Sequence, residues 1–142
     1  MSKNLDTLQR SWGIPSRLPI NGKAGVRLAA LVERIICQQP NVQTICDLGC
    51  GGGDLASRLS SHGFAVTGID ASEALLASAN EHHTGERIKF VRGVFGEIDA
   101  IAPAGSFDLA VSVDVIEHLF QPTQLLRDAH RLLRRDGRLV VC

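Results

Sequence analysis

Carboxylates and glycines are concentrated around one turn in the first half of the chain. Asp47 precedes the run GCGGG at residues 49–53, and Asp54 follows that run directly. Glycines allow a tight turn and let backbone atoms approach a ligand more closely than larger residues would. The apolar run before the turn and the amphipathic stretch after it are typical of the opening of a nucleotide-binding βαβ unit. The charges around the turn bear on which nucleotide it suits.

The placement of the acidic residues favours a phosphate-free ligand that carries positive charge. A dinucleotide-binding loop follows the pattern G-x-G-x-x-G, whose third glycine would fall at position 54 if the pattern starts at Gly49. Asp54 stands there instead and would repel a pyrophosphate at the helix N-terminus. Asp47 suits a sulfonium or an amino group. S-adenosylmethionine (SAM) carries both groups and no phosphate, so it is the expected cofactor, with NAD as the alternative.

Asp70 is the candidate for binding the ribose of either nucleotide. It ends the apolar run 64–69 and follows the glycines by roughly 20 residues, the spacing at which an acidic residue accepts hydrogen bonds from ribose hydroxyls. Taken alone, it could be a surface turn residue. Together with the glycine loop, it is expected to bind ribose.

Strands and helices are expected to alternate along the chain. Apolar residues recur at helical spacing from Lys23 until Pro40 ends the segment. Further helices are expected over 54–61, 73–82 and 122–133, and strands over 42–48, 64–69, 88–91, 107–113 and from 138 onward. This order predicts an α/β fold, a Rossmann-like, mostly parallel sheet with helices on both faces.

Local signals mark the ends of two of these helices. Ser72 can cap the helix that begins at Glu73, and Asp136-Gly137 is expected to stop the last helix. The inward side of the helix over 73–82 is expected to comprise Ala74, Leu75, Leu76 and Ala77.

Composition and charge exclude several classes of function. Apolar residues make up 44% of the 142 residues and charged residues 21%, which suits one α/β domain with a sizeable core. Fifteen basic and fifteen acidic residues cancel, so nothing favours nucleic acid or an anionic membrane as a partner. A solvated helix face is the interpretation of the local cluster Arg127, Arg131, Arg134, Arg135 and Arg138.

The cysteines indicate neither a metal site nor a disulfide framework. The four of them lack CxxC spacing and a matching histidine cluster, so no metal is expected. Cys46 lies in an apolar run and is expected to be a small buried hydrophobe. No signal-peptide core and no apolar run of membrane-spanning length is recognised, so no membrane span is expected. The expected compartment is a reducing cytoplasm.

Four motifs in order resemble those of the class I SAM-dependent methyltransferases. They are DLGCGGG at 47–53, GIDAS at 68–72, FDLAVSVDVIEHL at 107–119 and LLRRDGRLVV at 132–141. The resemblance covers residues 45–142. Within the superfamily the chain is most similar to the small-molecule branch that carries Glu-His after the fourth strand, such as the ubiquinone-biosynthesis O-methyltransferases. The resemblance implies methyl transfer from SAM to a small-molecule acceptor, with a hydroxyl oxygen favoured.

The resemblance implies that the glycine loop binds the methionine part of the cofactor. Asp47 would hold the methionine amino group, directly or through water. Gly49 and Gly51, with Cys50 between them, would bring the backbone close to the ligand. The expected contacts of this loop are therefore mostly main-chain contacts.

The resemblance also implies where the nucleoside part lies. Asp70 would bind the ribose hydroxyls, and Ala71 would lie against the adenine face. The family often has an acidic residue after the third strand, and this chain has Val94 and Phe95 there. Adenine recognition would then rest on apolar packing by these two side chains and on backbone amides.

The segment after the fourth strand is expected to border the reacting methyl group. Ser112 and Val113 would line the methionine arm near the sulfonium, and Glu117 and His118 match the family's Glu-His pair. Two interpretations of His118 stay open. It could act as a general base on a hydroxyl acceptor, since a histidine pKa near 6.5 suits that work, or it could hydrogen-bond a neighbouring loop. Glu117 is interpreted as a structural or pocket-edge residue.

Two domain segments are expected. Residues 1–22 would form a leader or a lid over the cofactor site, and residues 23–142 the SAM-binding domain. The fold of the family continues past the fifth strand with an antiparallel strand pair, so the domain is expected to be truncated at its C-terminus. An uncovered fifth strand could pair with a second copy and form a homodimer. A non-catalytic or truncated SAM-binding module therefore stays an alternative to an active enzyme.

Overall fold

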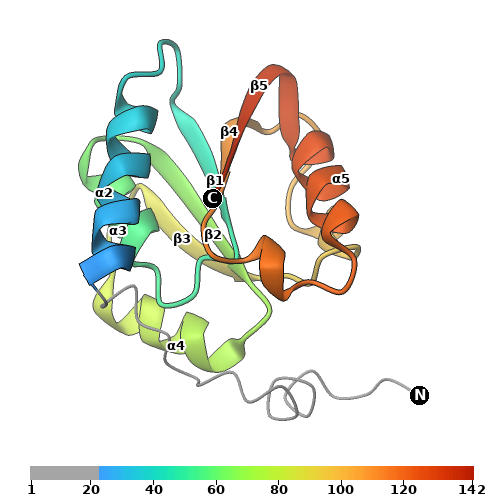
Figure 1. Ribbon diagram of the computed structural model, residues 1–142, viewed down its shortest axis with the longest axis horizontal. Helices are drawn as coiled ribbons and strands as arrows, with labels where there is room; N and C mark the ends of the chain where they lie inside the picture. The colour runs from blue at the N-terminus through green and yellow to red at the C-terminus, as the bar shows by residue number, and fades with distance from the viewer. Residues whose placement is uncertain (1–22) are drawn as a thin grey trace.

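The computed structural model describes residues 23–142, so the predicted leader or lid at 1–22 lies outside the described residues. The helices are α2 (Lys23–Cys37), α3 (Asp54–Ser61), α4 (Glu73–His82) and α5 (Pro122–Leu132), and the 3₁₀ turns are η1 (Ile98–Ala100) and η2 (Ile116–His118). The strands are β1 (Thr44–Leu48), β2 (Ala65–Asp70), β3 (Ile88–Arg92), β4 (Phe107–Ser112) and β5 (Leu133–Val141). Within residues 23–142, the strands and α-helices follow one another along the chain, except that β3 and β4 are joined by a 3₁₀ turn alone (Figure 1).

The strands form one sheet in the order β3-β2-β1-β4-β5, and every neighbouring pair is parallel. The predicted α/β, Rossmann-like sheet is therefore confirmed, and no antiparallel pair occurs among residues 23–142. The chain leaves β1 toward β2 on one side and returns later as β4 on the other side. Ligands of open parallel sheets bind where the strand order reverses in this way, beside the carboxyl ends of the strands. In this chain that position is the end of β1.

Two apolar clusters cover the two faces of the sheet. One joins α2 and α3 to the sheet, through Val32, Ile36 and Leu59 against Ile45 and Leu109. The other joins α5 and the loop before β4 to the opposite face, and comprises Cys46, Leu48, Ile69, Ile98, Phe107, Ala110, Ala129 and Leu132. Figure 1 shows α2, α3 and α4 on one side of the sheet and α5 on the other. Side chains of β1 alternate between the two clusters, so Asp47 lies on the same face as Ile45.

Helix α4 has the predicted bounds and cap but a different buried side. Ser72 Oγ accepts a hydrogen bond from the Leu75 N–H at 3.3 Å, which confirms the predicted cap. Leu76 and Ala79 are the buried residues of this helix, whereas Ala74 and Ala77 are exposed. The predicted inward position is confirmed for Leu76, whereas Leu75 is half-buried and the prediction is wrong for Ala74 and Ala77. Apolar residues surround this part of the helix, so their spacing does not select one face.

The boundary between α5 and β5 also differs from the prediction. The helix ends at Leu132 and the strand begins at Leu133, well before the predicted stop at Asp136-Gly137. Leu133 pairs with Phe107, and the next pair is Arg138 with Leu109, so residues 134–137 stand opposite the single residue Asp108. This bulge carries part of the arginine cluster into a strand. The interpretation of the cluster as one solvated helix face is therefore wrong.

Asp108 ties the amino ends of β1, β4 and β5 together. Its Oδ2 accepts hydrogen bonds from the backbone N–H groups of Gln43 and Thr44, at 2.7 and 2.9 Å. Its Oδ1 lies 2.6 Å from Arg134 Nη1. Burial alone would raise the pKa of Asp108, but the hydrogen bonds from Thr44 and Gln43 and the charge of Arg134 together lower it. Both carboxylate oxygens are thus occupied by the protein itself.

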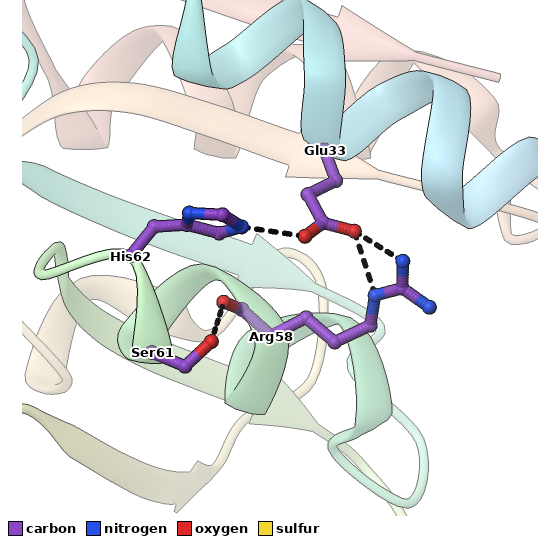
Figure 2. Close-up of polar contacts among 4 residues, drawn as sticks. All are labelled: Glu33, Arg58, Ser61 and His62. Carbon is purple, nitrogen blue, oxygen red and sulfur yellow. Dashed lines mark hydrogen bonds and ion pairs between the residues drawn. The ribbon is translucent and has the colours of Figure 1, made fainter.

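A second carboxylate joins α2 to α3 on the outer surface. Figure 2 shows Glu33 between Arg58 and His62, with one carboxylate oxygen directed at each. Arg58 Nε donates to Glu33 Oε2 at 2.7 Å, and His62 Nε2 lies 2.6 Å from Oε1. The hydrogen bond with His62 is the largest influence on the pKa of Glu33, which is lowered despite some desolvation. The Arg58 and His62 side chains are nearly half exposed, so this cluster is a surface link.

Candidate cofactor site

The glycine loop leaves β1 and is held against the end of β2. The N–H groups of Gly49 and Cys50 both donate to the Ile69 carbonyl, at 2.8 and 3.1 Å. The Gly53 N–H donates to the Cys50 carbonyl at 2.9 Å and closes the turn before α3. These bonds place the three predicted loop residues beside Asp70, which ends β2.

The glycines of the loop serve different purposes. Gly49 has φ +80°, a backbone conformation that strains other residues. A Cβ there would also lie 2.5 Å from Val115 Cγ2, so the space beside it excludes a larger side chain. A Cβ on Gly53 would lie 2.6 Å from the Phe90 ring. Gly53 therefore provides the close packing that the third glycine of a dinucleotide loop provides one position later. Gly51 and the residue after it have no atom within 4 Å of an added Cβ, so open space lies above them.

Asp47 is a buried carboxylate, and one of its oxygens has no hydrogen-bond partner among residues 23–142. The residue is 2% exposed, and the oxygen without a partner in that range is Oδ2. Burial raises the pKa of Asp47 to about 7, and the nearby carboxylate of Asp70 adds to the rise. Burying an ionised carboxylate without a partner costs several kcal/mol, so such a group is retained where a partner arrives with a ligand. A cationic group is the partner that would restore its charge.

Asp70 spans the two sides of the loop with its carboxylate. Oδ2 accepts the Gly51 N–H at 2.9 Å and Oδ1 accepts the Ser72 N–H at 2.8 Å. An ionised carboxylate offers about four acceptor sites, so roughly two stay available for hydroxyl donors. Asp70 and the half-buried Ala71 thus lie at one edge of the open space over the glycines.

The segment with Val94 and Phe95 begins at the same edge. The Gly93 N–H donates to the Asp70 carbonyl at 2.9 Å, and the Glu97 N–H closes a turn onto the Val94 carbonyl at the same distance. Val94 and Phe95 are both half-buried, and Phe95 packs against the apolar cluster on the α5 face. The structure thus brings the two predicted adenine contacts next to the predicted ribose contact.

The end of β4 is joined to the end of β1. Ser112 is fully buried, and its Oγ donates to the Leu48 carbonyl at 2.8 Å. The Ser112 hydroxyl therefore links two strands and is shielded from solvent. Val113 is half-buried and packs with the cluster under α2 and α3.

His118 is the last residue of η2, which follows the end of β4. It is exposed, and its backbone N–H donates to the Val115 carbonyl at 2.9 Å. Among the described residues the His118 ring makes no hydrogen bond or ion pair, so the interpretation as a loop-bonding residue has no support within that range. Glu117 beside it is exposed as well. Val115, which fills the space beside Gly49, connects this segment to the glycine loop.

Sequence reasoning did not identify Asp128 and Arg131 of α5. Asp128 is 7% exposed, and its Oδ2 accepts the Gly96 N–H at 2.7 Å. Arg131 donates through Nη1 to the Ala102 carbonyl and through Nη2 to the Ile98 carbonyl, at 3.1 and 3.0 Å. The available signal was an acidic residue inside the buried helical stripe of Leu125, Asp128, Ala129 and Leu132.

Other features of the described residues do not add a second site. No group of three or more His, Cys, Asp or Glu side chains in this part of the chain could hold a metal ion. None of its helices combines the length and apolar character needed to cross a bilayer. An open hollow of about 290 Å³ between α2 and α3 is lined in part by Val26, Asp54, Arg58 and His83, and by none of the predicted cofactor residues.

The site chemistry fits the expected cofactor. A buried, unpartnered carboxylate, open space over Gly51 and an acidic residue at the end of β2 suit a nucleoside that also carries a positive charge. Asp54 is the first residue of α3, and its Oδ1 lies 3.3 Å from His83 Nε2, so the helix N-terminus carries a negative group where a pyrophosphate would bind.

Most of the chain matches one known protein family. Residues 46–141 match the methyltransferase domain family, which is more than half of the chain. A ubiquinone biosynthesis O-methyltransferase from Pseudomonas paraeruginosa is 35% identical over 99 residues, covering 68% of this chain and 42% of that protein. The chain thus spans about two fifths of the length of this curated relative.

Two solved structures share the fold at moderate identity. The crystal structure of an S-adenosylmethionine-dependent methyltransferase from Mesorhizobium loti is 28% identical with a TM-score of 0.69, covering 87% of this chain and 54% of that one. The crystal structure of the [4+2]-cyclase SpnF is 26% identical with a TM-score of 0.73, covering 92% and 48%. The fold therefore occurs in proteins that are named for different reactions.

Proposed function

The chain belongs to the methyltransferase domain family, and on this premise we propose that it binds SAM at the carboxyl ends of β1, β2 and β4 and directs its methyl group to a hydroxyl oxygen of a small molecule. Membership of this family implies SAM as the methyl donor. The observation that carries the proposal for this chain is the buried Asp47 oxygen without a partner.

We assign the cofactor contacts from the groups that are available at this edge. Asp47 would hold the methionine amino group, since it is the buried carboxylate that lacks a partner. The backbone of Gly49, Cys50 and Gly51 would border the ligand where no side chain fills the space. Asp70 would accept hydrogen bonds from the ribose hydroxyls with the acceptor sites that Gly51 and Ser72 leave available.

The remaining cofactor contacts are assigned by position. Ala71, Val94 and Phe95 would enclose the adenine, because all three are half-buried and follow the ends of β2 and β3. The methionine arm would pass Ser112 and Val113. Ser112 would contribute backbone there, since its hydroxyl is bonded to the Leu48 carbonyl.

The chemistry divides between the cofactor and the chain. Bound SAM supplies a methyl group already activated by the positive sulfur, so the protein has to position the reactants and exclude water. A hydroxyl acceptor must also lose its proton. His118 is the candidate base, because its ring is exposed and free of other bonds among residues 23–142.

The choice of a hydroxyl acceptor rests on relatives. The curated protein from Pseudomonas paraeruginosa is named an O-methyltransferase, and the chain covers 42% of its length. Activity, acceptor and partners of the whole protein are therefore part of the proposal.

Calorimetric titration of the chain with S-adenosylhomocysteine and, separately, with NADH tests the cofactor assignment. We expect binding of S-adenosylhomocysteine and none of NADH. Asp47→Asn should weaken S-adenosylhomocysteine binding, whereas Asp136→Asn on the exposed part of β5 serves as the matched control and should not. Binding of NADH alone would contradict the proposal.

Transfer of a labelled methyl group from SAM to a panel of phenols, amines and carboxylates tests the reaction. We expect labelled phenols, and a lower rate for His118→Ala at unchanged S-adenosylhomocysteine affinity. An unchanged rate in that variant would remove His118 from the proposal.

A second candidate is a SAM-binding module that does not transfer methyl groups. The observation in its favour is the similarity to the [4+2]-cyclase SpnF. It predicts S-adenosylhomocysteine binding of ordinary affinity together with no labelled product from any acceptor class. The two titrations and the transfer assay thus separate the candidates.

A further inference from the structure

We infer that Asp128 and Arg131 of α5 are positioning residues, which hold the loop after β3 so that Val94 and Phe95 enclose the adenine of the cofactor. This inference rests on the proposed function, because it assigns the loop to the adenine end of that site. It adds two residues that lie in a helix on the far side of the sheet from α3.

Asp128 fixes the first turn of the loop. Its Oδ2 accepts the Gly96 N–H at 2.7 Å, and Gln124 Nε2 donates to its Oδ1 at 3.3 Å. Gly96 has φ +94°, and a Cβ there would lie 3.3 Å from Gln124 Cδ. Few residues other than glycine tolerate this conformation, so glycine at this position permits the turn whose N–H points at Asp128.

Arg131 fixes the second half of the same loop. One turn further along α5, its two Nη atoms donate to the carbonyls of Ile98 and Ala102. Ile98 is the first residue of η1 and its side chain is 1% exposed, whereas Ala102 follows the end of η1. A guanidinium holds two acceptors in a fixed relation, so the loop is clamped across its width.

The front of the loop is bound to the candidate site. The Gly93 N–H donates to the Asp70 carbonyl, and the Glu97 N–H donates to the Val94 carbonyl. A Cβ on Gly93 would lie 2.3 Å from Ile101 Cδ1 and 2.7 Å from Ile69 Cγ2, so the loop lies tightly on β2. Val94 and Phe95 are thus placed between an anchor at Asp70 and an anchor at Asp128. Displacement of the second anchor changes where these side chains lie.

Binding of two ligands separates positioning of the adenine from a general loss of structure. S-adenosylhomocysteine carries the amino-acid arm, and 5′-methylthioadenosine lacks it. Titrations are performed at a temperature at which each variant is fully folded by circular dichroism. We expect Asp128→Ala to weaken binding of both ligands by the same factor, about five- to tenfold.

Three variants make the comparison specific. Asp128→Asn keeps an acceptor oxygen for the Gly96 N–H and should restore most of the affinity. Asp47→Asn should weaken S-adenosylhomocysteine alone, because methylthioadenosine lacks the amino-acid arm and its α-amino group. Asp136→Ala makes the same side-chain change as Asp128→Ala at an exposed position and should bind both ligands as the wild type does.

The possible outcomes are distinct. Wild-type affinities in folded Asp128→Ala, a loss confined to S-adenosylhomocysteine, or no recovery in Asp128→Asn would each overturn the inference while the proposed function stands. A wild-type chain that binds neither ligand would overturn the proposed function itself. If Asp128→Ala does not fold, Arg131→Lys replaces it, since a single ammonium cannot hold both carbonyls. Wild-type affinity for both ligands in that variant would overturn the inference.

Discussion

Two aspartates in the neighbouring strands β1 and β4 stand near opposite ends of the sheet in opposite circumstances. At the amino end, Asp108 accepts two backbone N–H bonds and an ion pair with Arg134, and its pKa is lowered. At the carboxyl end, the buried Asp47 has an oxygen without a partner among the described residues, and its pKa is raised to about 7. At the amino end, protein groups satisfy the carboxylate of Asp108, so it stabilises the fold. At the carboxyl end, ionised Asp47 lowers the stability of the free protein, and we expect a ligand to supply the partner that it lacks.

The largest expected effect is on the pH dependence of stability through Asp47. Its pKa is higher in the folded chain, so its contribution is fully present below about pH 4 and is lost as the pH rises toward 7. A difference of about three pKa units corresponds to something on the order of 4 kcal/mol. Asp47→Asn cannot ionise, so its free energy of unfolding in urea should gain on the wild type between pH 4 and 8. If the free energies of unfolding of the wild type and Asp47→Asn changed with pH in the same way, the raised pKa of Asp47 would be wrong.

Asp108→Ala should lower stability at neutral pH. The variant leaves two backbone N–H groups and Arg134 without their partner, which we expect to reduce the free energy of unfolding by about 2–3 kcal/mol. Because the pKa of Asp108 is lowered in the folded chain, its contribution is present above the ordinary value of 3.8 and decreases as the pH falls below it. Urea unfolding at pH 7 and pH 3 measures both. A loss of S-adenosylhomocysteine affinity with unchanged stability would contradict the assignment of Asp108 to stability and of the opposite end of the sheet to ligand binding.

Asp70→Ala should reduce binding at the carboxyl end. A charge-assisted contact with ribose is worth roughly 1.5–3 kcal/mol, which is a loss of about ten- to 150-fold in affinity. The variant also frees the N–H groups of Gly51 and Ser72, which favours the upper part of that range. Calorimetry with S-adenosylhomocysteine measures the loss, with Asp108→Ala as the control that keeps its affinity. Equal affinities in wild type and Asp70→Ala would show that the ribose assignment is wrong.

The smallest expected effect comes from the surface carboxylate between α2 and α3. Glu33→Gln weakens the links to Arg58 and His62, whose side chains are nearly half exposed. We expect a loss of about 0.5 kcal/mol in the free energy of unfolding, reduced further at high salt, and no change in ligand affinity. A loss as large as that of Asp108→Ala would mean that the two backbone N–H bonds to Asp108 do not set it apart from Glu33.

Regular elements were predictable because their signals are local. The glycine turn, the Ser72 cap and the acidic end of β2 each depend on a few neighbouring residues, and the parallel sheet follows from the alternation of elements. The start of β5 was not predictable. Leu133 reads as the last apolar residue of a helix, and it becomes a strand residue because it pairs with Phe107 across the bulge.

Candidate site residues could be predicted where the residue type and its position at a strand end were informative. They could not be predicted where the contact joins residues far apart in the sequence. Asp47 and Asp70 stand out as carboxylates at strand ends. Ser112, in contrast, bonds to a carbonyl 64 positions away, and Asp128 bonds to an amide 32 positions away. Such contacts depend on the strand order and on the side of the sheet that a helix covers, which local spacing does not report.

The hydrogen bond from Ser112 to Leu48 also has a consequence for folding kinetics. Because it joins the two central strands across 64 positions, the proposed ligand edge exists only after the most non-local pairing of the sheet has formed. No early, locally structured species would offer this edge. Binding energy is therefore added to the complete fold alone, and a ligand present at a hundred times its Kd would raise the free energy of unfolding by about 2.7 kcal/mol.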